Sequence, residues 1–199
     1  VTVPRRETLV VVATPQYLRE LLPSAAYEGP FPLDGSRQGE VFITLPAASA
    51  PSEELEQWLV ANAGPEAIDL TAIHEAVPGH HLQLTRAKGH RSRLRRTFWD
   101  VFFGEGWAHY IEGMMDETGF FSPRGRLWML FERYFQLIRA RVAIGLHAEG
   151  WSLERAERYL IWKLSLPAKE AARAAVRWAL LYPIESLSYA LGRLVLLRI

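Results

Sequence analysis

Cysteine is absent from the 199 residues, and this absence limits the chemistry that the chain can use. A disulfide, a thiolate zinc site and a cysteine nucleophile are all excluded. Any metal site must therefore be built from histidine and carboxylate ligands. Lysine is also scarce, at positions 88, 163 and 169, so most of the 23 basic residues are arginine. We assign no function to this bias.

Strong net charge and long apolar runs are lacking as well. The net charge of +1 argues against a polyanionic partner, and we interpret the arginine-rich stretch 86–96 as a solvated helix start. No apolar run is long enough to span a bilayer, and the N-terminus lacks the pattern of a signal peptide. We therefore expect a cytoplasmic protein without nucleic-acid or membrane partners. A homo-oligomer or a partner subunit stays open.

The remaining composition is that of a globular protein, with 49% hydrophobic residues over the length of one large domain. Residues 8–13 and 40–45 are short apolar segments that predict two strands, separated by a turn-rich loop at 23–39. We expect residues 1–50 to form a small antiparallel β ribbon and residues 51–199 a helical core. The class is therefore mainly α. The predicted helices cover residues 52–63, 66–77, 78–88, 91–117, 124–148, 152–164, 167–181 and 183–198.

One short stretch concentrates the chemistry: His74, Glu75, His80 and His81 fall within eight residues. A helix can present two imidazoles to zinc with a carboxylate beside them for the attacking water. The alternative is a set of polar residues that cap a helix ending at Val77.

The spacing leaves two choices for the second imidazole. An ideal helix places His80 at about 600° from His74, and His81 at about 700°, back on the same face but roughly 10 Å farther along the axis. Pro78 interrupts the hydrogen-bond ladder and Gly79 lets the backbone bend, so a bulge there would bring His80 toward His74. We predict His80 as the ligand and keep His81 as the alternative.

Glu105 is the best source of a third ligand. It lies in an apolar, aromatic segment between two glycines, where a carboxylate is costly to bury unless it is paired or bound to a metal. A structural ion pair with an arginine is the alternative. His109 and Glu112 follow on roughly the same helical face and suit the role of orienting a ligand imidazole, although a purely structural role is equally open.

These residues carry a resemblance. His74–Gln83 (HEAVPGHHLQ) and Glu105–Glu112 (EGWAHYIE) resemble the signature of the bacterial domain-of-unknown-function family 885, regarded as zinc metallopeptidases related to the gluzincins. Further similar segments are Asp34–Gly39, Gly145–Trp151, Tyr182-Pro183 and Tyr189–Gly192. The chain is similar to the C-terminal part of these longer proteins. It departs from them at Ile184-Glu185, which replaces a usual Gly-Gln.

The resemblance implies a zincin-like helical fold and a zinc ion on His74, His80 and Glu105, with Glu75 as the general base. We expect hydrolysis of a peptide substrate, with His147 and Tyr189 as candidate hydrogen-bond donors to the oxyanion. Either residue could equally be a core residue with a satisfied polar end. The strand 40–45 could pair with an extended peptide if its edge is open. The alternatives are an inactive metal-binding or regulatory module, or a fragment that needs another chain to complete its cleft.

Overall fold

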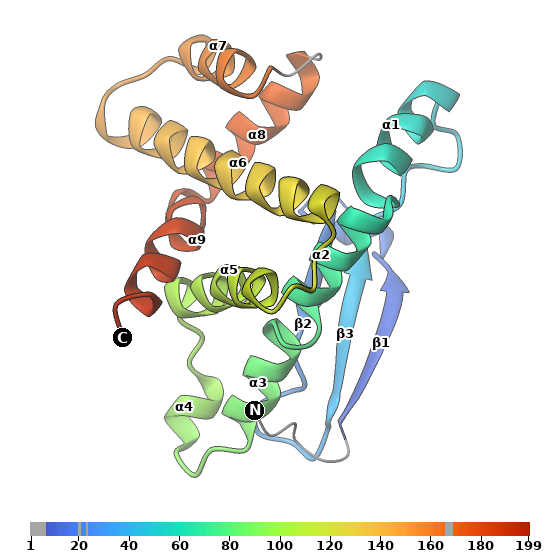
Figure 1. The fold of residues 1–199 in the computed structure, drawn as a ribbon, viewed down its shortest axis with the longest axis vertical. Coiled ribbons are helices and arrows are strands. Elements are labelled where there is room, and N and C mark those ends of the chain that lie inside the picture. Colours follow the sequence, from blue (N-terminus) through green and yellow to red (C-terminus); the bar gives the residue numbers. More distant parts are fainter. Residues whose placement is uncertain (1–6, 20, 23, 166–168) are drawn as a thin grey trace. The chain divides into compact units, whose positions relative to one another are not determined.

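The computed structural model describes residues 7–19, 21–22, 24–165 and 169–199, which are mostly helical (Figure 1). The predicted class, mainly α with a small sheet near the N-terminus, is confirmed. Contacts divide the chain into two compact units. The first comprises the described residues up to Trp99 together with Ile111–Trp128, and the second comprises Asp100–Tyr110 and Met129–Ile199. The expectation of one catalytic domain over residues 1–199 stays a prediction.

The sheet of the first unit is mixed. Its strands are β1 (Thr8–Ala13), β2 (Ala25–Glu28) and β3 (Gln38–Ile43), in the order β1-β3-β2. The two predicted strands pair in parallel, not as an antiparallel ribbon, and β2 supplies the antiparallel partner. The sequence predicts a loop over the β2 segment because prolines and glycines punctuate residues 23–39. The first residue of that predicted loop, at position 23, lies outside the described residues.

The central position of β3 changes one prediction. Because β3 pairs with β1 on one side and with β2 on the other, it offers no open edge to a peptide. The predicted docking of a substrate on strand 40–45 is therefore wrong. Two buried threonines, Thr14 and Thr44, join the strand ends by a hydrogen bond of 2.8 Å between their hydroxyl groups. Helix α1 (Ser52–Asn62) adds the indole N–H of Trp58, which donates to the Thr44 carbonyl at 3.0 Å.

Two consecutive helices carry the histidine motif. α2 (Pro65–Glu75) begins with proline at its first position and packs against β2, and α3 (His80–Lys88) follows after a break at residues 76–79. The peptide bond between Val77 and Pro78 is cis. Across the break, the His81 N–H donates to the Ala76 carbonyl at 3.1 Å, a bond five residues long where a regular helix has four. The predicted interruption at Pro78-Gly79 is present.

The segment predicted as one helix over 91–117 is two helices, α4 (Arg93–Thr97) and α5 (Val101–Glu117). Each begins at a side chain that caps it. The Ser92 hydroxyl accepts from the Arg95 N–H, and the Asp100 carboxylate accepts from the Phe103 N–H at 2.7 Å. These capping residues are readable from the sequence, and we overlooked them because the apolar pattern runs on without interruption.

The remaining helices are α6 (Pro123–Ala148), α7 (Leu153–Leu164), α8 (Lys169–Leu181) and α9 (Pro183–Leu196). The start predicted for α8, residue 167, lies outside the described residues. In the second unit, a buried core includes Val142 and Leu160, which are fully enclosed. Each such side chain contributes about 1.5–3 kcal/mol relative to an exposed one. In the same unit α5 lies close to α9, since a Cβ on Gly106 would meet the backbone of Gly192 at 2.5 Å.

Candidate metal centre

The break between α2 and α3 turns one histidine of the pair toward His74. The ring centroids of His74 and His80 are 4.9 Å apart, with the ring planes nearly perpendicular. His80 is buried, and the Trp99 ring lies against it at 5.8 Å between centroids. A glycine precedes His80 for a steric reason, because a Cβ at Gly79 would collide with the carbonyl oxygens of Ile73 and His74.

The other histidine of the pair has a different partner. His81 is buried, and its Nδ1 is hydrogen-bonded to the Tyr27 hydroxyl of β2 at 2.9 Å. Burial lowers the pKa of His81, although the charge of Glu7 opposes this, and burial also raises the pKa of Tyr27. Both directions favour a neutral imidazole hydrogen-bonded to a protonated phenol. The geometry therefore favours His80, and not His81, as the residue that faces the candidate site.

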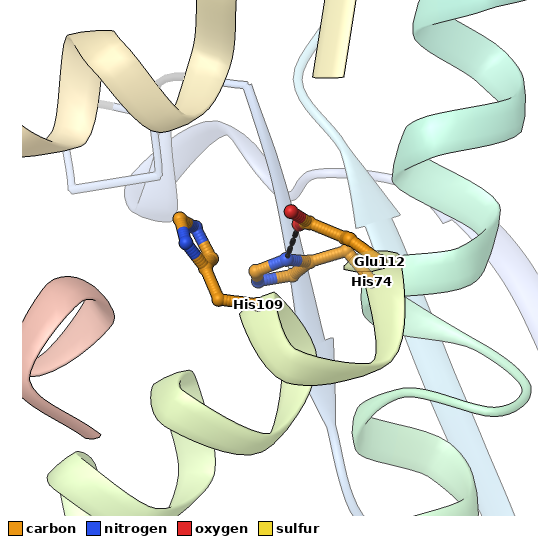
Figure 2. A group of neighbouring side chains, drawn as sticks. All are labelled: His74, His109 and Glu112. Carbon is orange, nitrogen blue, oxygen red and sulfur yellow. Dashed lines mark hydrogen bonds and ion pairs between the residues drawn. The ribbon is translucent and has the colours of Figure 1, made fainter. Parts of the chain in front are cut away.

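A buried carboxylate holds the His74 ring. The Nδ1–H of His74 donates to Glu112 Oε1 at 2.8 Å, and Glu112 is only 3% exposed (Figure 2). This bond selects the tautomer in which Nε2 of His74 carries the lone pair that a metal needs. Glu112 thus occupies the orienting role expected from the sequence.

Helix α5 supplies three of the candidate side chains from one face. Since α5 is continuous, Glu105 and His109 keep fixed positions along it, about two turns and one turn before Glu112. Figure 2 shows His109 and Glu112 of this helix beside His74. Two overlapping sets of ligand atoms result among the described residues. One joins His74, His80 and Glu105, and the other joins His74, His109 and Glu112, with the ligand atoms of each set within 4.8 Å of one another.

The first set fits the zinc ion that the sequence predicts. Two imidazole nitrogens and one carboxylate oxygen are a usual donor set for a catalytic zinc, with bonds of about 2.0–2.2 Å. Tetrahedral ligands at those bond lengths lie roughly 3.4 Å apart. Atoms already within 4.8 Å need only small side-chain adjustments to reach that spacing. Zinc itself, and the assignment of its ligands, stay predictions.

Glu75 follows His74 directly and ends α2. Its side chain is 9% exposed, and it makes no hydrogen bond or ion pair with another residue of the described part of the chain. A carboxylate that is enclosed but not engaged by the protein can accept a proton from a water molecule. The role of Glu75 as the general base stays a prediction.

The two predicted oxyanion donors differ in their surroundings. Tyr189 on α9 packs its ring against the His109 ring at 5.1 Å between centroids, and its hydroxyl donates to Glu185 Oε1 at 3.4 Å. His147, at the end of α6, instead donates from Nε2 to the Ala179 carbonyl of α8 at 3.3 Å. The contact of His147 therefore joins two helices of the second unit, and only Tyr189 lies beside a residue of the candidate site.

Two further residues of this region were missed in the sequence. Tyr27 lay in the segment assigned to a loop, and no local pattern links it to His81. Arg139, on α6, is 8% exposed, and its guanidinium carbon lies 5.1 Å from the centroid of the Tyr189 ring. Near it, burial raises the pKa of Glu185, the charge of Glu105 adds to the rise, and the charge of Arg139 opposes it.

Solved structures share this fold. One, described as "the putative lipoprotein from Colwellia psychrerythraea", has 27% sequence identity and a TM-score of 0.82 over 99% of this chain and 32% of that one. Another, "a putative lipoprotein of unknown function from Shewanella oneidensis", has 24% identity and a TM-score of 0.76 over 100% of this chain and 35% of that one. The chain thus spans about a third of the length of these proteins.

Two other observations bear on identity. No curated protein matches the chain. Among the described residues, no helix combines the length and the apolar character needed to cross a membrane. The family comparison is positive over the whole sequence, and it agrees with the resemblance carried by the histidine and glutamate motifs. Residues 1–199 match the family model described as "Bacterial protein of unknown function (DUF885)", and the chain belongs to that family.

Proposed function

We propose that this chain is the catalytic part of a zinc-dependent hydrolase that cleaves peptide bonds, a metallopeptidase of gluzincin type. The observation that carries the proposal is the set formed by His74, His80 and Glu105, whose ligand atoms lie within 4.8 Å of one another. Zinc bound there supplies a water of lowered pKa and polarises a carbonyl group.

The protein residues around the set then have separate tasks. Glu112 fixes the tautomer and orientation of His74 through the bond to Nδ1. Glu75, next in sequence to His74, takes the proton of the attacking water and passes it to the leaving amine. Tyr189, beside His109, is the candidate donor to the developing oxyanion.

The location of the protein is a second part of the proposal. The solved relative at 27% identity is described as "the putative lipoprotein from Colwellia psychrerythraea", and this description favours the cell envelope over the cytoplasm that we expected from the sequence. Fractionation of the source cells tests this part. After cell lysis a lipid-anchored envelope protein sediments with the membranes, whereas a cytoplasmic protein stays in the soluble fraction.

Turnover by the purified chain tests the main proposal. The zinc-loaded wild type is incubated with a mixed library of unmodified peptides, and new termini are identified by mass spectrometry. We expect Glu75→Gln to keep its zinc and to lose about 10²–10⁴-fold in kcat/KM, because an amide cannot accept the proton of the water. Asp69→Asn, an exposed change on the same helix, serves as the control. Zinc binding without any cleavage by the wild type would identify an inactive metal-binding module instead.

A further inference from the structure

Arg139 is a buried cation whose guanidinium lies over two aromatic rings. Its guanidinium carbon lies 5.1 Å from the centroid of Tyr189 and 5.6 Å from that of Trp178. The side chain is 8% exposed. A guanidinium that lies over an aromatic face keeps its N–H groups in its own plane, where they stay available to an acceptor.

One edge of this guanidinium has no acceptor. Nε and Nη2 of Arg139 are buried, and neither makes a hydrogen bond within the described part of the chain. These two nitrogens form one side of the arginine fork, the pair of parallel N–H groups that binds a carboxylate through both oxygens. A buried cation whose N–H groups lack an acceptor is costly in free energy. An anion bound at this edge of Arg139 would remove that cost.

The nearest carboxylate of the protein does not fill this role. Glu185 is close enough for the Arg139 charge to affect its pKa. However, no ion pair joins the two side chains among the described residues, and Glu185 Oε1 accepts from the Tyr189 hydroxyl. That hydrogen bond is long, at 3.4 Å, and is readily given up.

We propose that the Nε and Nη2 edge of Arg139 binds the free C-terminal carboxylate of the peptide substrate, so that the enzyme acts as a carboxypeptidase; this inference rests on the proposed function. The Tyr189 ring lies next to both the Arg139 guanidinium and the His109 ring of α5. Its centroid is 5.1 Å from the guanidinium carbon and 5.1 Å from the centroid of His109. The path from Arg139 to His109 is therefore at most about 10 Å, the length of roughly three extended residues. The released piece is a single amino acid or a very short peptide.

Binding by metal-free protein tests this inference separately from catalysis. Chelator-treated protein is mixed with N-acetylated tetrapeptides of random sequence, prepared once with a free C-terminal carboxylate and once with a C-terminal amide. The retained peptides are counted by mass spectrometry after ultrafiltration. We expect the acid form to be retained at least about tenfold more than the amide form, and Arg139→Gln to abolish this preference.

Two variants sharpen the test. Arg141→Gln is the matched control, since Arg141 also lies over a tryptophan ring but already pairs with Glu149 at 2.7 Å; it should keep the preference. Arg139→Lys keeps the positive charge but lacks the paired N–H groups, so it should keep only part of the preference for the acid form. This variant remains informative if Arg139→Gln does not fold.

Each outcome decides the inference. Equal retention of acid and amide by the wild type, or no retention of either, overturns it, as does a preference that survives in Arg139→Gln. Failure of the proposed function looks different, because the acid is then preferred in binding while the zinc-loaded protein cleaves neither form. If the zinc-loaded protein cleaves the acid and amide peptides at equal rates, the proposed hydrolase activity stands and the carboxypeptidase inference is wrong.

Discussion

At the scale of single residues, the candidate site depends on how the His74 imidazole is held. Its Nδ1 faces a carboxylate that is almost fully enclosed, so the ring is fixed in one orientation and one tautomer. The negative charge of Glu112 also makes the other ring nitrogen a stronger donor to a metal. We therefore expect Glu112 to contribute to metal affinity, although we do not count it among the ligands.

This role predicts the effect of removing the charge. Glu112→Gln should weaken zinc binding by about 10–100-fold, because an amide of similar shape cannot raise the basicity of the imidazole as a carboxylate does. The measurement is competition for zinc with a chromogenic chelator. Glu117→Gln, at an exposed position of the same helix, should leave the affinity unchanged. Wild-type affinity in Glu112→Gln would show that the bond to His74 is only structural.

Glu185 predicts a dependence of stability on pH. Burial, together with the charge of Glu105, raises its pKa above the ordinary value of 4.5, and the charge of Arg139 opposes the rise. Since the native state holds this proton more tightly than the unfolded state, the free energy of unfolding falls as pH rises from about 4.5 through the raised pKa. Glu185→Gln removes this loss, so the variant should gain stability relative to the wild type over that range.

Urea unfolding of both metal-free proteins, from about pH 4.5 to neutral, measures this difference. The amide keeps an acceptor for the Tyr189 hydroxyl, so the comparison isolates the charge. A difference in unfolding free energy that is constant over the range would mean that folding leaves the pKa of Glu185 unchanged, and a difference that shrinks with rising pH would mean that folding lowers it.

At the scale of elements, the interruption between α2 and α3 decides which histidine faces His74. The backbone at Gly79 passes so close to the carbonyl groups of Ile73 and His74 that a side chain does not fit. Any larger residue must push α3 away from the end of α2. The ring of His80, at the first position of α3, would then move with the helix.

Gly79→Ala should therefore destabilise the protein by about 1–3 kcal/mol and weaken zinc binding, because backbone atoms cannot rotate out of the way. Thermal unfolding and zinc competition measure the two effects. Gly89→Ala, at the other end of α3, meets only ordinary van der Waals contacts and should change both quantities little. Equal effects of the two substitutions would remove the steric argument for this glycine.

Much of the element pattern could be predicted from sequence. Helical periodicity located most of the helices, and Pro78-Gly79 marked the interruption, because proline and glycine act through the local backbone. The errors arose where tertiary contacts or caps decide. β2 forms because β3 supplies a partner, and the helix over 91–117 divides because Asp100 caps a new one.

At the scale of the whole molecule, the sequence led to the fold class and to the family, because the motifs of the candidate site are local. His74, Glu75 and His80 lie within one short stretch, and Glu105 and Glu112 within one helix. Tyr27 and Arg139 could not be found in this way. Their partners, His81 and the ring of Tyr189, are about 50 residues distant in sequence and come near only through folding.

The chain also spans only about a third of the solved structures that share its fold. The activity, substrate and partners that we propose therefore concern the part of the protein seen here. Within this part, α5 carries residues of both compact units and Glu105, the one carboxylate ligand that we propose. The central claim is that the metal is held by His80 and not by His81.

Zinc affinity of His80→Ala and His81→Ala, measured against the wild type by chelator competition, tests this claim most directly. Both side chains are buried, so the variants are matched in the packing that they lose. The wild type should bind about one zinc per chain, and His80→Ala should lose more than the 10–100-fold that is typical of an orienting partner. His81→Ala should bind zinc almost as the wild type does, since its ring contacts Tyr27. A wild type that takes up no zinc, or a His81→Ala variant that loses the metal while His80→Ala keeps it, would contradict the account.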